Sequence, residues 1–183
     1  PEFSWVTKFG GTANDMGHSI AVDNLGYTYL TGEFRNIIDF GGGFVFDASG
    51  TGRCDYYLLK LNPTGSTVWA VKGGGTLTNR GFGLTIDQNG NIYTTGHYFG
   101  QADFSGTILN SAGNLDNIVA KYDNSGNLLW IRDGKSVSQV SSRGIALDAA
   151  GNVFVSGYFG SATVDSVTFD GLKVVTNGQR DIF

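Results

Sequence analysis

The chain has 183 residues, a net charge of −4 and a hydrophobic share of 40%, which is enough apolar surface to offset chain entropy and excludes a disordered chain. It has no cluster of lysine and arginine, so we expect no nucleic-acid partner. A single cysteine, Cys54, excludes an intrachain disulfide. No stretch of eighteen apolar residues occurs, and we therefore expect no membrane insertion.

The first three residues, Pro1, Glu2 and Phe3, resemble what a cloning site leaves after tag cleavage. We interpret residues 1–3 as a remnant of this kind. The repeat region is then expected to cover residues 4–183.

An internal repeat dominates this region. Trp5, Trp69 and Trp130 recur at spacings of 64 and 61 residues, and such a fixed period indicates a repeat architecture. Two further sets keep the same spacings: Asp23, Asp87 and Asp148; Gly26, Gly90 and Gly151. The modules are expected at about residues 4–64, 65–125 and 126–183, the last one truncated.

The second module shows the expected elements most clearly. Residues 81–87 and 91–98 are rich in β-formers and flank a turn at 87–90, which predicts a hairpin. Residues 117–122 and 127–131 predict a second hairpin around the turn at 123–126. Residues 100–114 between the hairpins predict a long loop, with or without a short extra hairpin.

Two other segments complete the expected chain order. The N-terminal residues 4–9 align with the last strand of a module and predict a lone outer strand. The glycine triplets at 41–43 and 73–75 lack the following lysine of a nucleotide loop. We expect both triplets to form flexible turns.

Four antiparallel strands per module, repeated at this period, favour an all-β fold made of β-propeller blades. No long segment has the 3.6-residue apolar period of a helix. Residues 116–130 and 148–158 (an Asp-Xaa-Xaa-Gly-Asn turn, a strand ending in Ser-Gly and a Trp-closed hairpin) resemble the bacterial SBBP-type β-propeller repeat. The resemblance implies an extracellular or cell-surface bacterial protein with surface or adhesive roles, and it brings no shared catalytic residues.

Three blades do not close a ring by themselves, since propellers have four to eight blades. By alignment the chain stops inside a strand of its third module. Two interpretations stay open. The chain is part of a larger propeller, or two chains form a homodimer that completes a six-bladed ring.

Several repeated residue types have two interpretations each. The tryptophans could stack on sugars, but their identical module position favours packing between blades. Asp23, Asp87, Asp123 and Asp148 could bind calcium, but each precedes a turn glycine, where aspartate bonds to the local backbone. We therefore expect no cofactor and no metal site. The recurring pairs Asp55/Lys60 and Asp116/Lys121 are expected to form ion pairs facing neighbouring blades or solvent.

Ligand contacts are expected where the modules differ, on one rim of the propeller. The candidate ligand-binding residues are Arg35, His97, Tyr98, Asp103 and Tyr158. No catalytic residues are predicted, because no nucleophile motif surrounds either histidine. The leading hypothesis is a non-catalytic scaffold for binding or adhesion with a protein or glycan ligand. The alternatives are a carbohydrate-active lyase or hydrolase built on the complete propeller, and a structural spacer in a surface filament.

Overall fold

A computed structural model describes residues 2, 4–48, 53–161, 165–176 and 178–183. Pro1 and Phe3 lie outside the described residues. The structure therefore does not test whether residues 1–3 are a cloning remnant. The described chain is all-β, and no helix in it could cross a membrane. The strands are β1 (Met16–Val22), β2 (Thr28–Phe34), β3 (Ile37–Asp39), β4 (Val45–Asp47), β5 (Asp55–Leu61), β6 (Thr67–Gly75), β7 (Asn79–Ile86), β8 (Ile92–Tyr98), β9 (Gln101–Phe104), β10 (Thr107–Asn110), β11 (Asp116–Tyr122), β12 (Leu128–Ser136), β13 (Val140–Leu147), β14 (Val153–Phe159), β15 (Ser166–Phe169), β16 (Leu172–Val175) and β17 (Asp181–Ile182).

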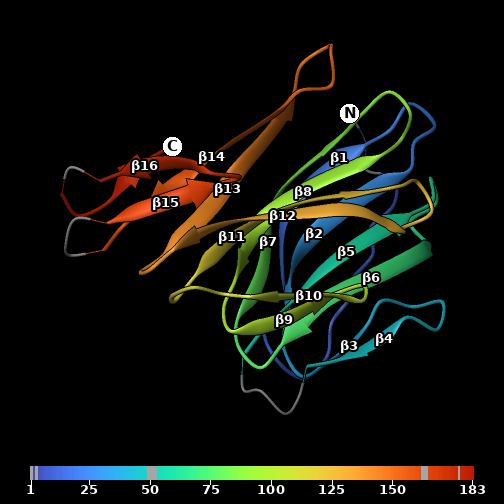
Figure 1. Ribbon diagram of the computed structural model, residues 1–183. Helices are drawn as coiled ribbons and strands as arrows, with labels where there is room; N and C mark the ends of the chain where they lie inside the picture. The colour runs from blue at the N-terminus through green and yellow to red at the C-terminus, as the bar shows by residue number, and fades with distance from the viewer. Residues whose placement is uncertain (1, 3, 49–52, 162–164, 177) are drawn as a thin grey trace.

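The described strands form four antiparallel sheets, three of which contain the units that we call blades, while β3 and β4 make up the fourth. Blade 1 contains β1, β2, β5 and β6, blade 2 contains β7, β8, β11 and β12, and blade 3 contains β13, β14 and β17. Figure 1 shows the three sheets fanned out, and the inner strands β1 and β13 both pack against β7. The two predicted hairpins per module are therefore confirmed in blades 1 and 2. The structure begins β7 two residues earlier than predicted and extends β12 to Ser136.

The long loop of each module contains an extra hairpin, which joins the preceding blade in the second and third modules. In the first module the hairpin β3–β4 forms a two-stranded sheet of its own. The hairpin β9–β10 of the second module pairs with β6 of blade 1, and β15–β16 pairs with β12 of blade 2. Figure 1 shows β9 and β10 beside β6. Each completed sheet thus has six strands, two of which the following module supplies. This exchange ties consecutive modules together through main-chain hydrogen bonds.

The expectation for the two glycine triplets is correct for one of them and wrong for the other. Residues 41–43 have φ angles of +74°, +62° and +89° and form a turn. Residues 73–75 lie within β6. A Cβ on Gly73 would stand 2.1 Å from the Phe104 ring. Glycine is required there because the incoming hairpin packs directly on the strand.

The N-terminal segment was expected to form an outer strand, but no strand is assigned over residues 4–9. Gly10 bridges Asp39 of β3, as Gly74 of β6 pairs with Asp103 of β9. The Trp5 ring covers Gly65. The segment therefore follows the path of an outer strand, although no neighbouring strand of its own blade pairs with it among the described residues.

Aromatic side chains fill the space between blades 1 and 2. Tyr29, Tyr56 and Trp69 of blade 1 share one core cluster with Tyr98 and Tyr122 of blade 2. Burial of aromatic rings supplies most of the stabilisation of such a contact. Blade 3 has a smaller core, formed by Val140, Phe159 and Val167 with Phe169 and Phe183.

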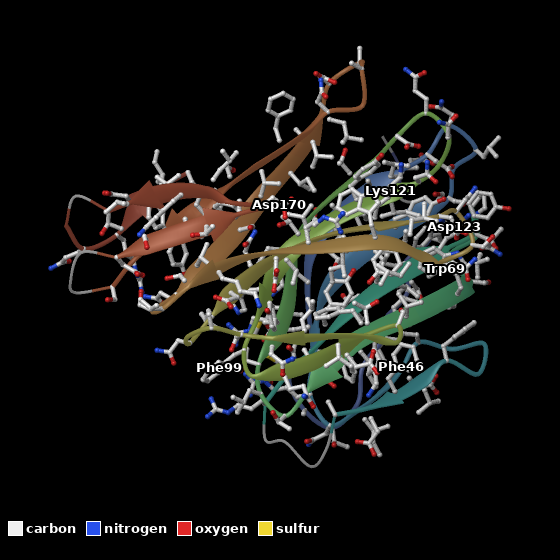
Figure 2. The ribbon with its side chains drawn as sticks, in the orientation of Figure 1. Phe46, Trp69, Phe99, Lys121, Asp123 and Asp170 are labelled. Carbon is white, nitrogen blue, oxygen red and sulfur yellow. The ribbon has the colours of Figure 1, made fainter. Side chains whose placement is uncertain are left out.

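The tryptophan of blade 1 binds a turn of blade 2. Trp69 Nε1 donates a hydrogen bond of 3.0 Å to the Asn124 carbonyl, and the Lys60 ammonium donates to the same carbonyl and to the Asn124 side chain. Figure 2 shows Trp69 beside the turn that contains Asp123. Packing between blades, rather than sugar stacking, is thus confirmed for Trp69.

The repeated aspartates shape their own turns. In all four, Oδ1 accepts backbone N–H groups two and four residues ahead, at 2.8–2.9 Å. This is the local bonding expected of aspartate before a turn glycine. Hydrogen bonds from Asn127 hold the pKa of Asp123 below its usual value. In the part of the chain that the structure describes, no three histidine, cysteine or acidic side chains gather as metal ligands do.

The recurring acid and lysine positions do not pair with each other. Lys60 contacts the neighbouring blade, which was one of the two surroundings expected for it. Its partner there is Asn124, however, and not an acidic side chain. The Asp55 carboxylate lies 3.8 Å from Lys72, and Lys121 lies 3.8 Å from Asp87 of its own blade. The residues thus make polar contacts in the blades, with different partners from one module to the next.

Candidate functional site: the axial cluster

Each inner strand has a β-bulge at the same position. The antiparallel register slips between Gly17 and Ser19 in β1, between Gly81 and Gly83 in β7, and between Ser142 and Gly144 in β13. A bulge inserts one extra residue and redirects its side chain. The bulged residues are His18, Phe82 and Arg143. The same backbone feature therefore carries a different side chain in each blade.

The three bulged side chains stack on one another along the inner strands. The ring centroids of His18 and Phe82 lie 4.9 Å apart, and the Arg143 guanidinium lies 3.8 Å from the Phe82 centroid. An arginine over an aromatic face is attracted by the ring electrons. Contiguous contacts thus link blades 1, 2 and 3. We call His18, Phe82 and Arg143 the axial cluster, together with three polar residues that contact them or one another: Glu33, Arg80 and His97.

A second set of equivalent positions surrounds the stack. Glu33, His97 and Tyr158 occupy the same place in the second strand of each blade, at spacings of 64 and 61. Glu33 contacts Arg80 of blade 2 at 2.5 Å, and His97 Nδ1 lies 2.8 Å from Ser141 Oγ of blade 3. The position therefore makes a polar contact with the following blade in both interfaces.

Glu33 is the centre of a buried charged group. Its side chain is 3% exposed, and besides Arg80 it lies 3.5 Å from His18 Nε2. Arg80 Nε also contacts the Cys54 sulfur at 3.3 Å. A buried carboxylate requires such a partner, because an unpaired buried charge is very costly. Burial raises the pKa of the Cys54 thiol, which keeps it protonated and unreactive at neutral pH.

His97 is buried and neutral. Burial lowers its pKa to about 3, and the positive charges of Arg80 and Arg143 contribute to the shift. Its ring stands edge to face with Phe82 at 5.1 Å, and Nε2 has no hydrogen-bond partner among the described residues. A histidine that stays neutral far below pH 7 cannot exchange a proton with a substrate near neutrality. We assign it a packing role between blades 2 and 3.

The structure separates the five predicted ligand residues. Tyr98 is buried and donates a hydrogen bond of 2.7 Å to Asp133, and His97 is buried as described. Arg35 is half-buried at the end of β2, and Asp103 is exposed on β9, which pairs with the outer strand β6. Tyr158 lies beside the axial cluster, with Arg143 and Arg180 over its ring. Only His97 and Tyr158 are thus associated with one cluster, and the ligand assignments stay predictions.

The bulged residues escaped the sequence prediction. Their signal is present in the aligned modules, where His18, Phe82 and Arg143 differ in charge and shape although only glycine or serine stands on either side of each. Arg80 was missed for the same reason, since its equivalents are Met16 and Ser141. Alternation along a strand does not mark a bulge, because the extra residue becomes visible only in the pairing.

Comparison with known proteins supports the architecture. Residues 4–33 match the family model of the β-propeller repeat. The chain is also 32% identical over 149 residues to an uncharacterised WD repeat-containing protein, L264, of Acanthamoeba polyphaga mimivirus. That alignment covers 67% of this chain and 11% of the relative. The chain is thus similar to repeat proteins of the propeller class and spans about a tenth of the length of the curated relative.

Proposed function

We propose that the chain is a non-enzymatic interaction scaffold that binds a protein partner at the axial cluster. The observation that carries this proposal is the bulge repeated in β1, β7 and β13, which presents His18, Phe82 and Arg143 on an otherwise repeated backbone. A rigid scaffold with one variable position per module suits recognition. The similarity to a WD repeat-containing protein supports a protein partner over a glycan, which is the second candidate ligand.

The chemistry of the cluster supports binding over catalysis. Glu33 is held by Arg80, and His97 is buried and neutral. Asp103 lies on the hairpin at the outer strand of blade 1, whereas Arg35 directly follows β2. A general acid and base must both reach the reacting atoms. No observation favours the lyase or hydrolase alternative.

The resemblance of the modules to the SBBP-type repeat supports a setting at the bacterial surface or in secretion, with an adhesive role. We propose this setting for the chain as well. The spacer alternative differs in one respect, since it requires no ligand at all.

An array experiment tests the proposal. The labelled chain is applied to immobilised extracellular proteins and glycans, and each bound ligand is measured again with Arg143→Gln. We expect a protein ligand whose affinity falls at least about tenfold in the variant, as loss of a charge-assisted contact implies. Arg132→Gln is the matched control, because Arg132 is 62% exposed on the outer strand β12.

Two outcomes would overturn the proposal. Blank arrays would favour the spacer. Equal binding by the wild-type chain and Arg143→Gln would place the ligand elsewhere. A glycan ligand lost in Arg143→Gln would keep the site and replace the proposed partner class.

Blade 3 presents an open sheet face. On the matching face of blade 1, the inner strand β1 is exposed, whereas the N-terminal segment and the β3–β4 hairpin cover the remaining strands. We propose that both exposed surfaces receive further blades. Phe154 of blade 3 is 59% exposed, whereas its equivalents Tyr29 and Tyr93 are buried. Ile20 of blade 1 is 63% exposed, whereas its equivalent Leu84 is buried. Exposed apolar faces of this kind mark contact surfaces. The occupants are further blades of a longer array or, in a six-bladed ring, a second copy of the chain.

A further inference from the structure

Both completed interfaces are fixed by the same main-chain hydrogen bond. Asn79 N donates to the Cys54 carbonyl between blades 1 and 2, at 2.8 Å, and Val140 N donates to the Leu115 carbonyl between blades 2 and 3, at 2.6 Å. The equivalent carbonyl on blade 3 belongs to Arg180. A blade that docks on blade 3 in the same way therefore starts its inner strand at Arg180.

The residue after the N–H donor makes the polar side-chain contact. This residue is Arg80 in blade 2, which meets Glu33, and Ser141 in blade 3, which meets His97. On the open face of blade 3 the position of Glu33 and His97 is occupied by Tyr158. The next blade would thus place one side chain beside Tyr158 and Arg180.

Blade 3 carries positive charge where blade 1 carries negative charge. The Arg180 guanidinium lies 4.9 Å from the Tyr158 ring centroid. The Arg143 guanidinium lies 5.5 Å from the same centroid, with Nη2 3.5 Å from the hydroxyl. Over the described ranges, neither arginine has a carboxylate within 4 Å. Blade 1 has Glu33 and Cys54 at the positions of Tyr158 and Arg180.

We propose that the open face of blade 3 is a docking surface for a propeller blade with aspartate or glutamate at the position of Arg80. The carboxylate would accept charge-assisted hydrogen bonds from Arg180 and Arg143, as guanidinium groups favour. Phe154 and Ile182, 59% and 87% exposed, supply the apolar part of the contact. Between blades 1 and 2, the first blade supplies the carboxylate and the following blade supplies the arginine. On blade 3 the first blade would supply the arginines and the following blade the carboxylate, and this reversal allows blade 3 to select its neighbour.

A second copy of this chain does not match the surface. Its blade 1 has Met16 at the position of Arg80, which offers no charge to Arg180. It would also bring Asp15, the equivalent of Asn79, opposite Asp181, the equivalent of Asp55. Asn79 Nδ2 donates to Asp55 Oδ1 at 3.3 Å in the completed interface, whereas two carboxylates repel each other. The matching partner is therefore a blade of different sequence.

One substitution gives the existing chain the missing carboxylate. Met16→Glu places it on the exposed inner strand β1 of blade 1, and a second copy then serves as the matching blade. We expect self-association at least about tenfold tighter than that of Met16→Gln, measured by sedimentation equilibrium with the wild-type chain alongside. The difference should shrink at high salt, because exposed charge pairs are screened. Met16 is 47% exposed, so both variants should fold.

The controls separate this charge pairing from general association. Adding Arg180→Gln to Met16→Glu should remove the gain, whereas adding Arg132→Gln should leave it. Equal association of Met16→Glu and Met16→Gln would overturn the proposal. A gain that survives Arg180→Gln, or monomers for both variants at a concentration of 100 μM, would overturn it too. The array result does not enter this test, so the two proposals can fail separately.

Discussion

The two interfaces between blades use one backbone arrangement with different side chains. Between blades 1 and 2, the Tyr56 ring packs on Gly81, where a Cβ would come within 2.8 Å of the ring. Between blades 2 and 3, the equivalent residues are Asn117 and Ser142, and Asn117 Nδ2 donates to Ser142 Oγ at 2.9 Å. A large ring facing glycine is thus replaced by an amide facing a hydroxyl. Residues on the two sides of an interface change together because packing density must be kept.

The second interface buries its apolar side chains less completely. Leu58 and Trp69 of blade 1 are buried, whereas their equivalents in blade 2, Val119 and Trp130, are half-buried. A groove lies at each interface, of about 320 Å³ between blades 1 and 2 and about 270 Å³ between blades 2 and 3. Tyr56 Oη and Asn117 Oδ1 both lack hydrogen-bond partners among the described residues. Each interface thus contains a buried polar atom without a partner, and this feature does not distinguish them. The difference lies in packing. We therefore expect the contact between blades 1 and 2 to contribute more to stability.

Truncation at the equivalent positions should give the largest contrast. Tyr56→Ala removes a fully buried ring, and we expect it to lower the free energy of unfolding by about 3–5 kcal/mol. Asn117→Ala removes one hydrogen bond and should cost about 1 kcal/mol. Urea denaturation followed by tryptophan fluorescence measures both values. Similar losses for the two variants would contradict the comparison of packing.

Acid should weaken the second interface through His97. Its folded-state pKa of about 3 lies below the value of about 6.5 expected in the unfolded chain. Between these values the unfolded state binds the extra proton, so stability is present near pH 7 and is lost as the pH falls. The loss from His97 should reach about 2 kcal/mol at pH 5.

The His97→Gln variant isolates this effect. Burial raises the pKa of Asp55 and Asp116, which makes the folded state more stable as the pH falls, but this contribution is the same in both proteins. The wild-type chain should therefore lose stability relative to His97→Gln between pH 7 and 5, as measured by urea denaturation at each pH. Parallel pH profiles would show that His97 is not buried in its neutral form.

The smallest contrast concerns two turns of the same type. Gly126 and Gly151 have φ angles of +86° and +83°, where alanine is strained by about 1 kcal/mol. A Cβ on Gly126 would lie 3.0 Å from the Trp69 ring, whereas one on Gly151 would have no described heavy atom within 4 Å beyond its two chain neighbours. Gly126→Ala should thus cost about 2 kcal/mol and Gly151→Ala about 1 kcal/mol. Equal thermal midpoints would show that Trp69 does not press on the turn.

Much of the fold could be predicted because its signals are local. The turns that begin at Asp87 and Asp123 form through hydrogen bonds within five residues, and alternation marks the strands beside them. The pairing of β9 with β6 could not be predicted in this way, since it joins segments of different modules. Gly73 was taken for a flexible turn residue for this reason. Its partner, Phe104, is 31 residues away in the sequence.

The candidate site shares two residues with the predicted ligand set, whose role stays a prediction. Tyr158 and His97 were selected for residue type at a strand end, and both belong to the axial cluster or its border. His97 and Tyr98 point to opposite faces of blade 2, as successive residues of a strand do, and both faces are covered by neighbouring blades. Residue type alone therefore placed two buried side chains among the candidates and missed Arg143, which only the bulge brings into contact with Phe82.

The sequence alone determined the repeat, its period and the two hairpins of each module, because these depend on residues close together along the chain. Only the tertiary structure decided which blade receives each extra hairpin and which side chains meet at the inner strands. It also showed that Glu33 is paired with Arg80, while Arg143 and Arg180 border an open face. These features depend on contacts between modules. The residues that settle the burial of charge and the filling of space are far apart in the sequence: Glu33 and Arg80 are separated by 47 positions and Phe82 and Arg143 by 61.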